Sequence, residues 1–299
     1  MFSRRSFLGA VFTGAASAIA RIGFADAKKI PSPEYVNITY SKPEWVSISK
    51  GLDFAKVEIR RDREIIDVLA IIKADPRHNR IRVFSSFEEG KPLARTIEEW
   101  QKQTGALAMV NSAQYMADPF YMPCAPIICD GKLKGPKSNP SVRGMLVAEP
   151  LKANLPLADL LDFDFDQYTP ETYAQGVQHW PILLDRQGKI KVKKTGWQAR
   201  RTIVAKDSKG HILFITTEGS FFSLYNLGLF LKESNEKKDG GFHIQTAMNL
   251  DGGSEANMIV KTKRLSYVRY GPDKEDQNNA FNLFSLKRKI PGVIGVFAR

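Results

Sequence analysis

The sequence predicts an α+β fold in which a β-rich mixed sheet is packed by a few helices in a single main domain. About a dozen short segments are apolar throughout or alternate apolar with polar residues, as strands do. Only two segments carry a helical period. No linker rich in Gly, Ser or Pro divides the 299 residues, and β-rich domains of about 200–250 residues are common.

The N-terminus predicts export. Paired Arg4 and Arg5 are followed by Phe-Leu, a weakly apolar stretch rich in Ala and Gly, and the small-x-small sequence Ala-Asp-Ala at 25–27. This pattern resembles a twin-arginine signal peptide over residues 1–27, although a short amphipathic helix is an alternative. No other segment is apolar enough to span a membrane. We therefore expect a periplasmic or secreted bacterial protein with no stable membrane insertion after removal of the signal.

The first half of the chain is predicted to form an N-terminal arm followed by strands and a helix. Residues 28–50 contain Pro and little pattern, and they form the expected N-terminal arm with one edge strand. The main domain is expected over 51–299. Thr96 and Glu99 have the spacing of a capping box, and Gly105 suits a helix end. The segments expected in order are strands at 53–59, 66–74 and 80–86, a helix at 96–105 and a strand at 106–112.

The second half of the chain alternates hairpins with one longer helix. Asp, Gly and Lys between apolar runs predict the hairpins. The acidic, Pro-bearing residues 150–178 are interpreted as an insertion or lid. The remaining expected elements are hairpins at 127–133, 182–192 and 202–219, a helix at 220–234, and strands at 246–250 and 292–298.

The net charge and the cysteine content limit the kinds of ligand and metal site that we expect. A net charge of +12 favours the binding of polyanions. The alternative is that the charged side chains only keep the surface hydrated. Export makes nucleic acid an unlikely partner, so we expect a phosphorylated or acidic carbohydrate. Cys124 and Cys129 have neither a C-x-x-C spacing nor a second Cys/His pair for zinc. They form either a disulfide within a hairpin or two separate thiols.

Polar residues gather where predicted strands end. They lie in "VNSAQY" at 110–115, in "ARRT" at 199–202 with "TTEGS" at 216–220, and in "NLDGGSEA" at 249–256. Groups at neighbouring strand ends converge in space. The candidate site residues are Asn111, Arg201, Glu218, Asn249, Asp251, Gly252, Gly253 and Ser254.

The order of these motifs resembles the phosphodiester glycosidase family, most strongly over residues 100–299. The motifs are "NLDGGS" and "RRTIVAKDSKGHILFITTEG", with an Asn-bearing turn before them. The family includes an enzyme that removes N-acetylglucosamine from a mannose-6-phosphate diester, and bacterial relatives linked to exopolysaccharide. Family members usually have Asn-Gly-Gly-Phe where this chain has Asn-Ser-Ala-Gln at 111–114. They also have Asp-Gly-Arg where it has Glu-Gly-Ser at 218–220.

The resemblance implies an exported hydrolase that cleaves the glycosidic bond of a sugar-1-phosphodiester or a related envelope linkage. Asp251 and Glu218 are then the catalytic carboxylates, and Arg201 binds phosphate through its guanidinium fork. Asn111, Asn249 and Ser254 bind substrate, while Gly252 and Gly253 bring backbone N–H groups close to an anion. No cofactor is required in this interpretation.

Several alternatives stay open on the sequence alone. Asp251 with the two glycines can be a plain tight turn, or Asp251 and Asn249 can hold a calcium ion. Trp180 and Trp197 either stack on sugars or pack in the core or at its rim. The fold can serve a noncatalytic polysaccharide or cell-envelope binding protein, or a general phosphodiesterase that cleaves the P–O bond.

Overall fold

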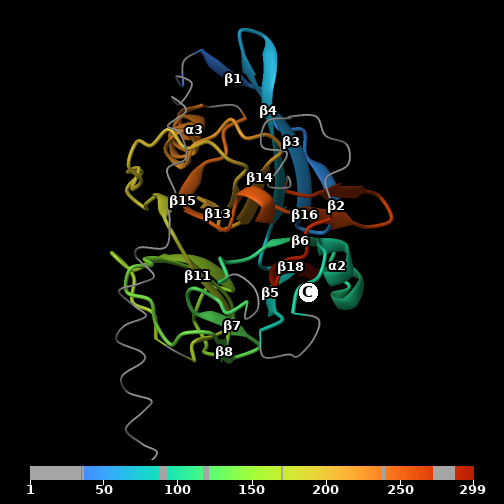
Figure 1. The fold of residues 1–299 in the computed structure, drawn as a ribbon, viewed down its shortest axis with the longest axis vertical. Helices are drawn as coiled ribbons and strands as arrows, with labels where there is room; N and C mark the ends of the chain where they lie inside the picture. Colours follow the sequence, from blue (N-terminus) through green and yellow to red (C-terminus); the bar gives the residue numbers. More distant parts are fainter. Residues whose placement is uncertain are drawn as a thin grey trace, which may run out of the picture.

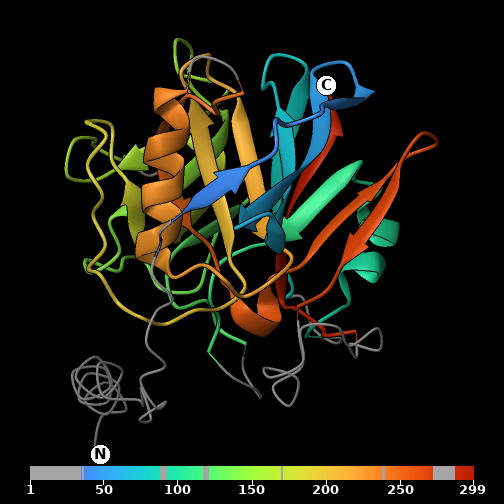
Figure 2. The same ribbon diagram turned by 90° about the horizontal axis from the view of Figure 1, so that it is seen from above.

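The computed structural model describes residues 35, 37–87, 93–116, 121–169, 171–237, 240–271 and 287–299. The predicted signal peptide lies outside these residues. The described residues form three antiparallel sheets and two α-helices, which are arranged as in Figures 1 and 2. The predicted strand-rich α+β fold is confirmed. Among the described residues, no helix has the length and apolar character needed to cross a membrane.

The eight-stranded sheet is the largest. Its order is β1-β3-β4-β14-β13-β15-β12, and β2 also pairs with β3. Runs rich in β-branched residues are buried along nearly the whole length of its central strands. The predicted arm supplies its first two strands rather than one. Its strands are β1 (Ile38–Tyr40), β2 (Val46–Ser49), β3 (Leu52–Arg61), β4 (Glu64–Ala74), β12 (Ile182–Leu184), β13 (Thr202–Asp207), β14 (Ile212–Thr217) and β15 (Ile244–Asn249).

Two five-stranded sheets share a core with it. One has the order β10-β9-β11-β7-β8 and the other β17-β16-β6-β18-β5. The strands of the first are β7 (Ile127–Cys129), β8 (Lys132–Lys134), β9 (Gly144–Pro150), β10 (Ala158–Asp162) and β11 (Tyr173–His179). Those of the second are β5 (Asn79–Ser85), β6 (Ala108–Asn111), β16 (Met258–Lys261), β17 (Ser266–Arg269) and β18 (Gly292–Ala298).

The interpretation of residues 150–178 as an insertion or lid is wrong. They hold all of β10 and most of β11, which flank β9 within a sheet. The acidic residues that suggested a lid are satisfied inside the fold. Asp159, for example, accepts a hydrogen bond from Lys206 Nζ at 2.7 Å.

The two helices cover opposite parts of the molecule (Figure 1). Helix α2 (Ile97–Thr104) has the predicted capping box and ends at Gly105 in the left-handed region. It packs Trp100 against the sheet that contains β6 and β18. Helix α3 (Leu224–Glu236) has Ser223 as its N-cap and starts at Leu224, four residues after the predicted start at 220. It packs on β12 and β15.

The central core lies where the three sheets meet, because buried side chains from all three contribute to one cluster. Within it, β6 and β15 deliver their C-terminal ends to the same region. Asp251 N donates to Ser112 O at 3.2 Å, which links the residues just after the two strands. The sheet junction therefore places two of the predicted site segments side by side.

Candidate active site

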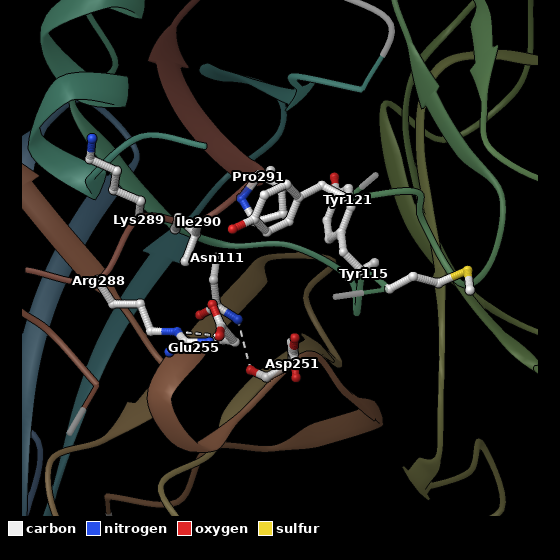
Figure 3. A pocket seen from close by; sticks show the side chains of 12 residues that line it. Asn111, Tyr115, Tyr121, Asp251, Glu255, Arg288, Lys289, Ile290 and Pro291 are labelled. Carbon is white, nitrogen blue, oxygen red and sulfur yellow. Dashed lines mark hydrogen bonds and ion pairs between the residues drawn. The ribbon is translucent and has the colours of Figure 1, made fainter. Parts of the chain in front are cut away.

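A pocket of about 350 Å³ opens at this junction (Figure 3). Three segments far apart in sequence form it: the end of β6 with the turn after it, the loop after β15, and the residues that lead into β18. The lining residues are Asn111, Ala113, Tyr115, Met116, Tyr121, Asp251, Glu255, Arg288, Lys289, Ile290, Pro291 and Gly292.

Asp251 is the predicted catalytic residue that lines this pocket. Burial and, to a smaller extent, the negative charge of Glu255 raise the pKa of Asp251 to about 8. A hydrogen bond from Gly252 N to Asp251 Oδ1 at 2.9 Å and the charge of Arg288 act in the opposite direction. Since desolvation disfavours the charged form, Asp251 is protonated at neutral pH. It can therefore donate a proton to a bound substrate.

Glu255 is the second carboxyl group of the pocket, and the sequence analysis did not place it among the catalytic residues. It ends the short 3₁₀ helix η1 (Gly253–Glu255). Arg288 Nε donates to Glu255 Oε1 at 2.5 Å (Figure 3). A guanidinium at this distance favours the ionised carboxylate. The pocket thus contains one protonated carboxyl and one carboxylate held by a cation.

The cationic side of the pocket comes from the segment before β18. Arg288 faces Glu255, whereas the Lys289 side chain points away from the two carboxyl groups in Figure 3. No strand-end pattern marked either residue. The only signal in the sequence was the short basic run at 287–289.

Asn111 holds the site together through its side chain. Its Nδ2 donates to Asp251 O at 2.7 Å, as Figure 3 shows. Its Oδ1 accepts from Thr202 Oγ1 at 2.8 Å and from Asn257 N at 3.1 Å. The amide therefore connects β6, β13 and the two ends of the loop that carries Asp251 and Glu255. Asn111 reaches the pocket as predicted, but its polar atoms position this loop.

The glycines after Asp251 allow the loop to pack tightly. A Cβ on Gly252 would lie 2.8 Å from Arg200 O, and Gly253 has a φ of +63°. Their N–H groups are already used, because Gly252 donates to Asp251 and Gly253 donates to Arg200 O at 2.8 Å. Ser254 Oγ donates to Glu255 Oε1 at 3.3 Å. The predicted anion contact from these residues stays a prediction.

Arg201 lies outside the pocket lining. It is only 9% exposed, and its guanidinium donates to two backbone carbonyls, Phe222 O at 3.3 Å and Trp197 O at 2.7 Å. Burial lowers the pKa of Arg201 to about 10. The guanidinium thus fixes the approach to β13 in this structure.

Glu218 and Asn249 are also absent from the pocket lining. Glu218 Oε1 accepts from Tyr267 OH and pairs with Lys56 Nζ, both at 2.8 Å. Asn249 Nδ2 donates to Trp180 O at 3.1 Å. The structure therefore brings Asn111 and Asp251 together with Glu255, and directs Glu218 and Asn249 to other contacts.

The structure also bears on the predicted metal ion and disulfide. Within the part of the chain that the structure describes, no group of three or more His, Cys, Asp or Glu side chains is arranged to hold a metal ion. The sulfur atoms of Cys124 and Cys129 are not joined in a disulfide. The calcium hypothesis stays a hypothesis.

Chemically, this pocket pairs an acid with a base. When two titratable groups are held at opposite protonation states by their surroundings, one can donate a proton while the other accepts one or attacks. Asp251 and Glu255 form such a pair in the pocket, and the arginine beside them can compensate a negative charge on a ligand.

Comparison with known protein families gives one match for this chain. Residues 104–297 match the family model described as phosphodiester glycosidase. No curated protein sequence is similar enough to this chain to be matched.

Solved structures share the fold at low identity. The zebrafish N-acetylglucosamine-1-phosphodiester alpha-N-acetylglucosaminidase catalytic domain, auto-inhibited by its pro-peptide, is similar with a TM-score of 0.59 and 17% identity over 88% of this chain and 89% of that one. A hypothetical protein from Synechocystis has a TM-score of 0.55 and 12% identity over 87% of this chain and 64% of that one. A protein from Burkholderia pseudomallei has a TM-score of 0.54 and 9% identity over 91% and 98%.

Proposed function

Because the chain belongs to the phosphodiester glycosidase family and is thus a glycosidase-type hydrolase, we propose that it cleaves the glycosidic bond of a sugar-1-phosphodiester in the pocket around Asp251. The observation that carries the proposal is the pairing of Asp251 with Glu255 beside Arg288 in one pocket. A phosphodiester adds one negative charge to the sugar, and Arg288 supplies a cation where that charge would enter.

The proposed reaction breaks the bond between the anomeric carbon and the phosphate oxygen. The bonding electrons leave with the phosphate, and Asp251 transfers its proton to that oxygen or to another phosphate oxygen as charge develops. Glu255 acts on the other side of the anomeric carbon. It either removes a proton from the attacking water or forms a covalent glycosyl ester that water then hydrolyses. The products are a sugar with a free anomeric hydroxyl and a phosphomonoester.

The assignment of roles differs from the one the sequence suggested. Glu218, bound to Tyr267 and Lys56, is replaced by Glu255 as partner of Asp251. Phosphate recognition moves from Arg201 to Arg288. The proposed substrate class is the same, a phosphorylated or acidic carbohydrate of the cell envelope or of an exopolysaccharide.

A sugar-1-phosphate p-nitrophenyl ester tests the reaction, because each bond that can break gives a different product. Glycosidic cleavage yields p-nitrophenyl phosphate and free sugar, and hydrolysis in oxygen-18 water puts the label on the sugar. Release of p-nitrophenol with label in the phosphate would instead establish a phosphodiesterase. Binding without turnover would establish a noncatalytic binding protein. The Asp251→Asn variant is the control for contaminating activity.

We also propose export by the twin-arginine route, on the pattern at 1–27. Changing Arg4 and Arg5 together to Lys should leave the precursor in the cytoplasm, because the paired guanidinium motif is read by a receptor. Fractionation followed by immunoblotting measures this. Normal accumulation of the double variant outside the cytoplasm would contradict the proposed route.

A further inference from the structure

Residues 189–197 form a surface segment beside α3 that belongs to no helix or strand. Ile190 and Val192 turn inward onto the cluster that contains α3 and β12, and Ile190 packs close to Gly228 of α3. Lys189, Lys191 and Lys193 precede, separate and follow these two residues in the sequence and face solvent instead. All three lysines are exposed.

The outward side of this segment carries uncompensated positive charge. Lys191 Nζ pairs with Asp164 at 2.9 Å. Lys189, Lys193 and Lys194, called the lysine row below, take part in none of the ion pairs among the residues that the structure describes. The lysine row thus gathers positive charge on one short exposed stretch of the chain, and such a concentration of charge favours a polyanion.

Trp197 ends the segment with an exposed indole. The residue is 58% exposed, although large aromatic side chains are mostly buried. Its backbone is fixed, since Trp197 O accepts from Arg201 Nη2 at 2.7 Å. A flat apolar ring with a polar N–H at its edge suits the face of a sugar ring.

The segment leads directly to the catalytic loop. Trp197 lies three residues before Arg200, a span of at most about 10 Å. Arg200 O accepts the N–H of Gly253 at 2.8 Å, and Gly253 belongs to the loop that holds Asp251 and Glu255. A chain bound along the lysine row would therefore arrive at the loop that forms the pocket.

We propose that the lysine row and Trp197 bind an acidic polysaccharide outside the pocket, so that the enzyme acts on a polymer. The choice of carbohydrate rests on the proposed function, whereas the binding surface itself rests on the exposure and charge of these residues. Single-stranded nucleic acid also combines a charged backbone with rings that stack on aromatic residues, and it serves as the competing probe.

Binding of defined polymers to the full-length mature protein tests the proposal. The protein carries Asp251→Asn so that no polymer is cut. Its affinity for polygalacturonate, neutral dextran and single-stranded DNA of similar length is measured by calorimetry at two salt concentrations. The charge variant is Lys193→Glu with Lys194→Glu. Its matched control has the same change of charge at exposed Lys102 of α2 and Lys132 of β8, away from α3.

We expect polygalacturonate to bind, dextran to bind much more weakly, and salt to weaken the binding. The Lys193/Lys194 variant should lose about tenfold or more in affinity, while the Lys102/Lys132 control should lose little. Trp197→Ala should lose affinity on the order of two- to tenfold. Turnover of the small p-nitrophenyl substrate by enzyme with an intact Asp251 should be unchanged by the Lys193/Lys194 substitutions.

Three outcomes would overturn the proposal: equal losses in the variant and its control, equal affinity for polygalacturonate and DNA, or no effect of Trp197→Ala. Failure of the proposed function is a separate result. In that case the small substrate is not hydrolysed, while polymer binding and its loss in the Lys193/Lys194 variant persist.

Discussion

Replacement of Asp251 by Asn should abolish most activity and at the same time stabilise the protein in a pH-dependent way. The amide keeps an oxygen for the Gly252 N–H, which bonds Asp251 Oδ1 at 2.9 Å, but it removes the proton that the carboxyl donates. General acid catalysis contributes about 10²- to 10⁴-fold, so kcat/KM should fall by that order. In the unsubstituted enzyme, kcat/KM should decline as the pH rises through about 8, where Asp251 loses its proton.

The stability gain follows from the same pKa. It is about 8 in the folded protein, against an ordinary value of 3.8. A folded-state pKa that lies above the unfolded value means that stability is fully present below pH 3.8 and is lost as the pH rises to 8. At about 1.4 kcal/mol for each pH unit, the loss is at most about 6 kcal/mol at pH 8 and about 4 kcal/mol at pH 7.

Solvent reaches the partly exposed Asp251 and reduces this loss, so about 2–3 kcal/mol is expected at pH 7. The Asn variant avoids the loss. For a chain of this size it should melt about 3–5 °C higher than the parent at pH 7 and at a similar temperature at pH 4. Differential scanning calorimetry at both pH values measures this. Asp62→Asn, in the exposed turn between β3 and β4, is the control.

Two results would refute this reasoning. A difference in melting temperature that is the same at pH 4 and pH 7 would mean that ionisation of Asp251 carries no cost in the folded protein. Activity within a few fold of the parent would mean that Asp251 only forms a turn.

Other substitutions separate catalysis from positioning. Glu255→Gln should lower kcat. Because the negative charge of Glu255 helps to raise the pKa of Asp251, the substitution should also move the alkaline fall in kcat/KM to lower pH. An unchanged pH profile would contradict that coupling. Asn111→Ala removes three hydrogen bonds and should cost about 1–3 kcal/mol in denaturant unfolding, with kcat falling more than KM changes. The guanidinium of Arg201 holds two backbone carbonyls. Arg201→Lys should therefore lower the melting temperature and reduce turnover of a phosphodiester and of a neutral glycoside by the same factor. A loss confined to the phosphodiester would show that Arg201 binds phosphate.

The sequence predicted those parts of the fold that local chemistry determines. The Thr96–Glu99 capping box forms as expected, with Glu99 N donating to Thr96 Oγ1 at 3.2 Å and Thr96 N donating to Glu99 Oε2 at 2.7 Å. Residues 150–178 were misread because their acidic side chains find partners far away in sequence. Asp159, for example, binds Lys206, 47 residues later. A sequence pattern contains no signal for such a partner.

The candidate site was predictable to the extent that strand ends define it. Asn111 ends β6, and Asp251 lies two residues after the end of β15. They meet because both strands end at the sheet junction. Arg201 also ends up near this loop, but whether a guanidinium faces a pocket or backbone carbonyls depends on its rotamer. Arg288 was not predicted, because only tertiary packing brings the segment before β18 to Glu255.

The Asn111 side chain has a consequence for the order in which the protein folds. Its three hydrogen bonds join residues that are 140, 91 and 146 positions apart. Contacts between distant residues require closure of long loops before they contribute, so they form slowly. The hairpins β3–β4 and β13–β14 need no such closure. During refolding from denaturant, strand formation seen by far-ultraviolet circular dichroism should therefore precede the return of catalysis, and an inactive, strand-rich intermediate should accumulate between them.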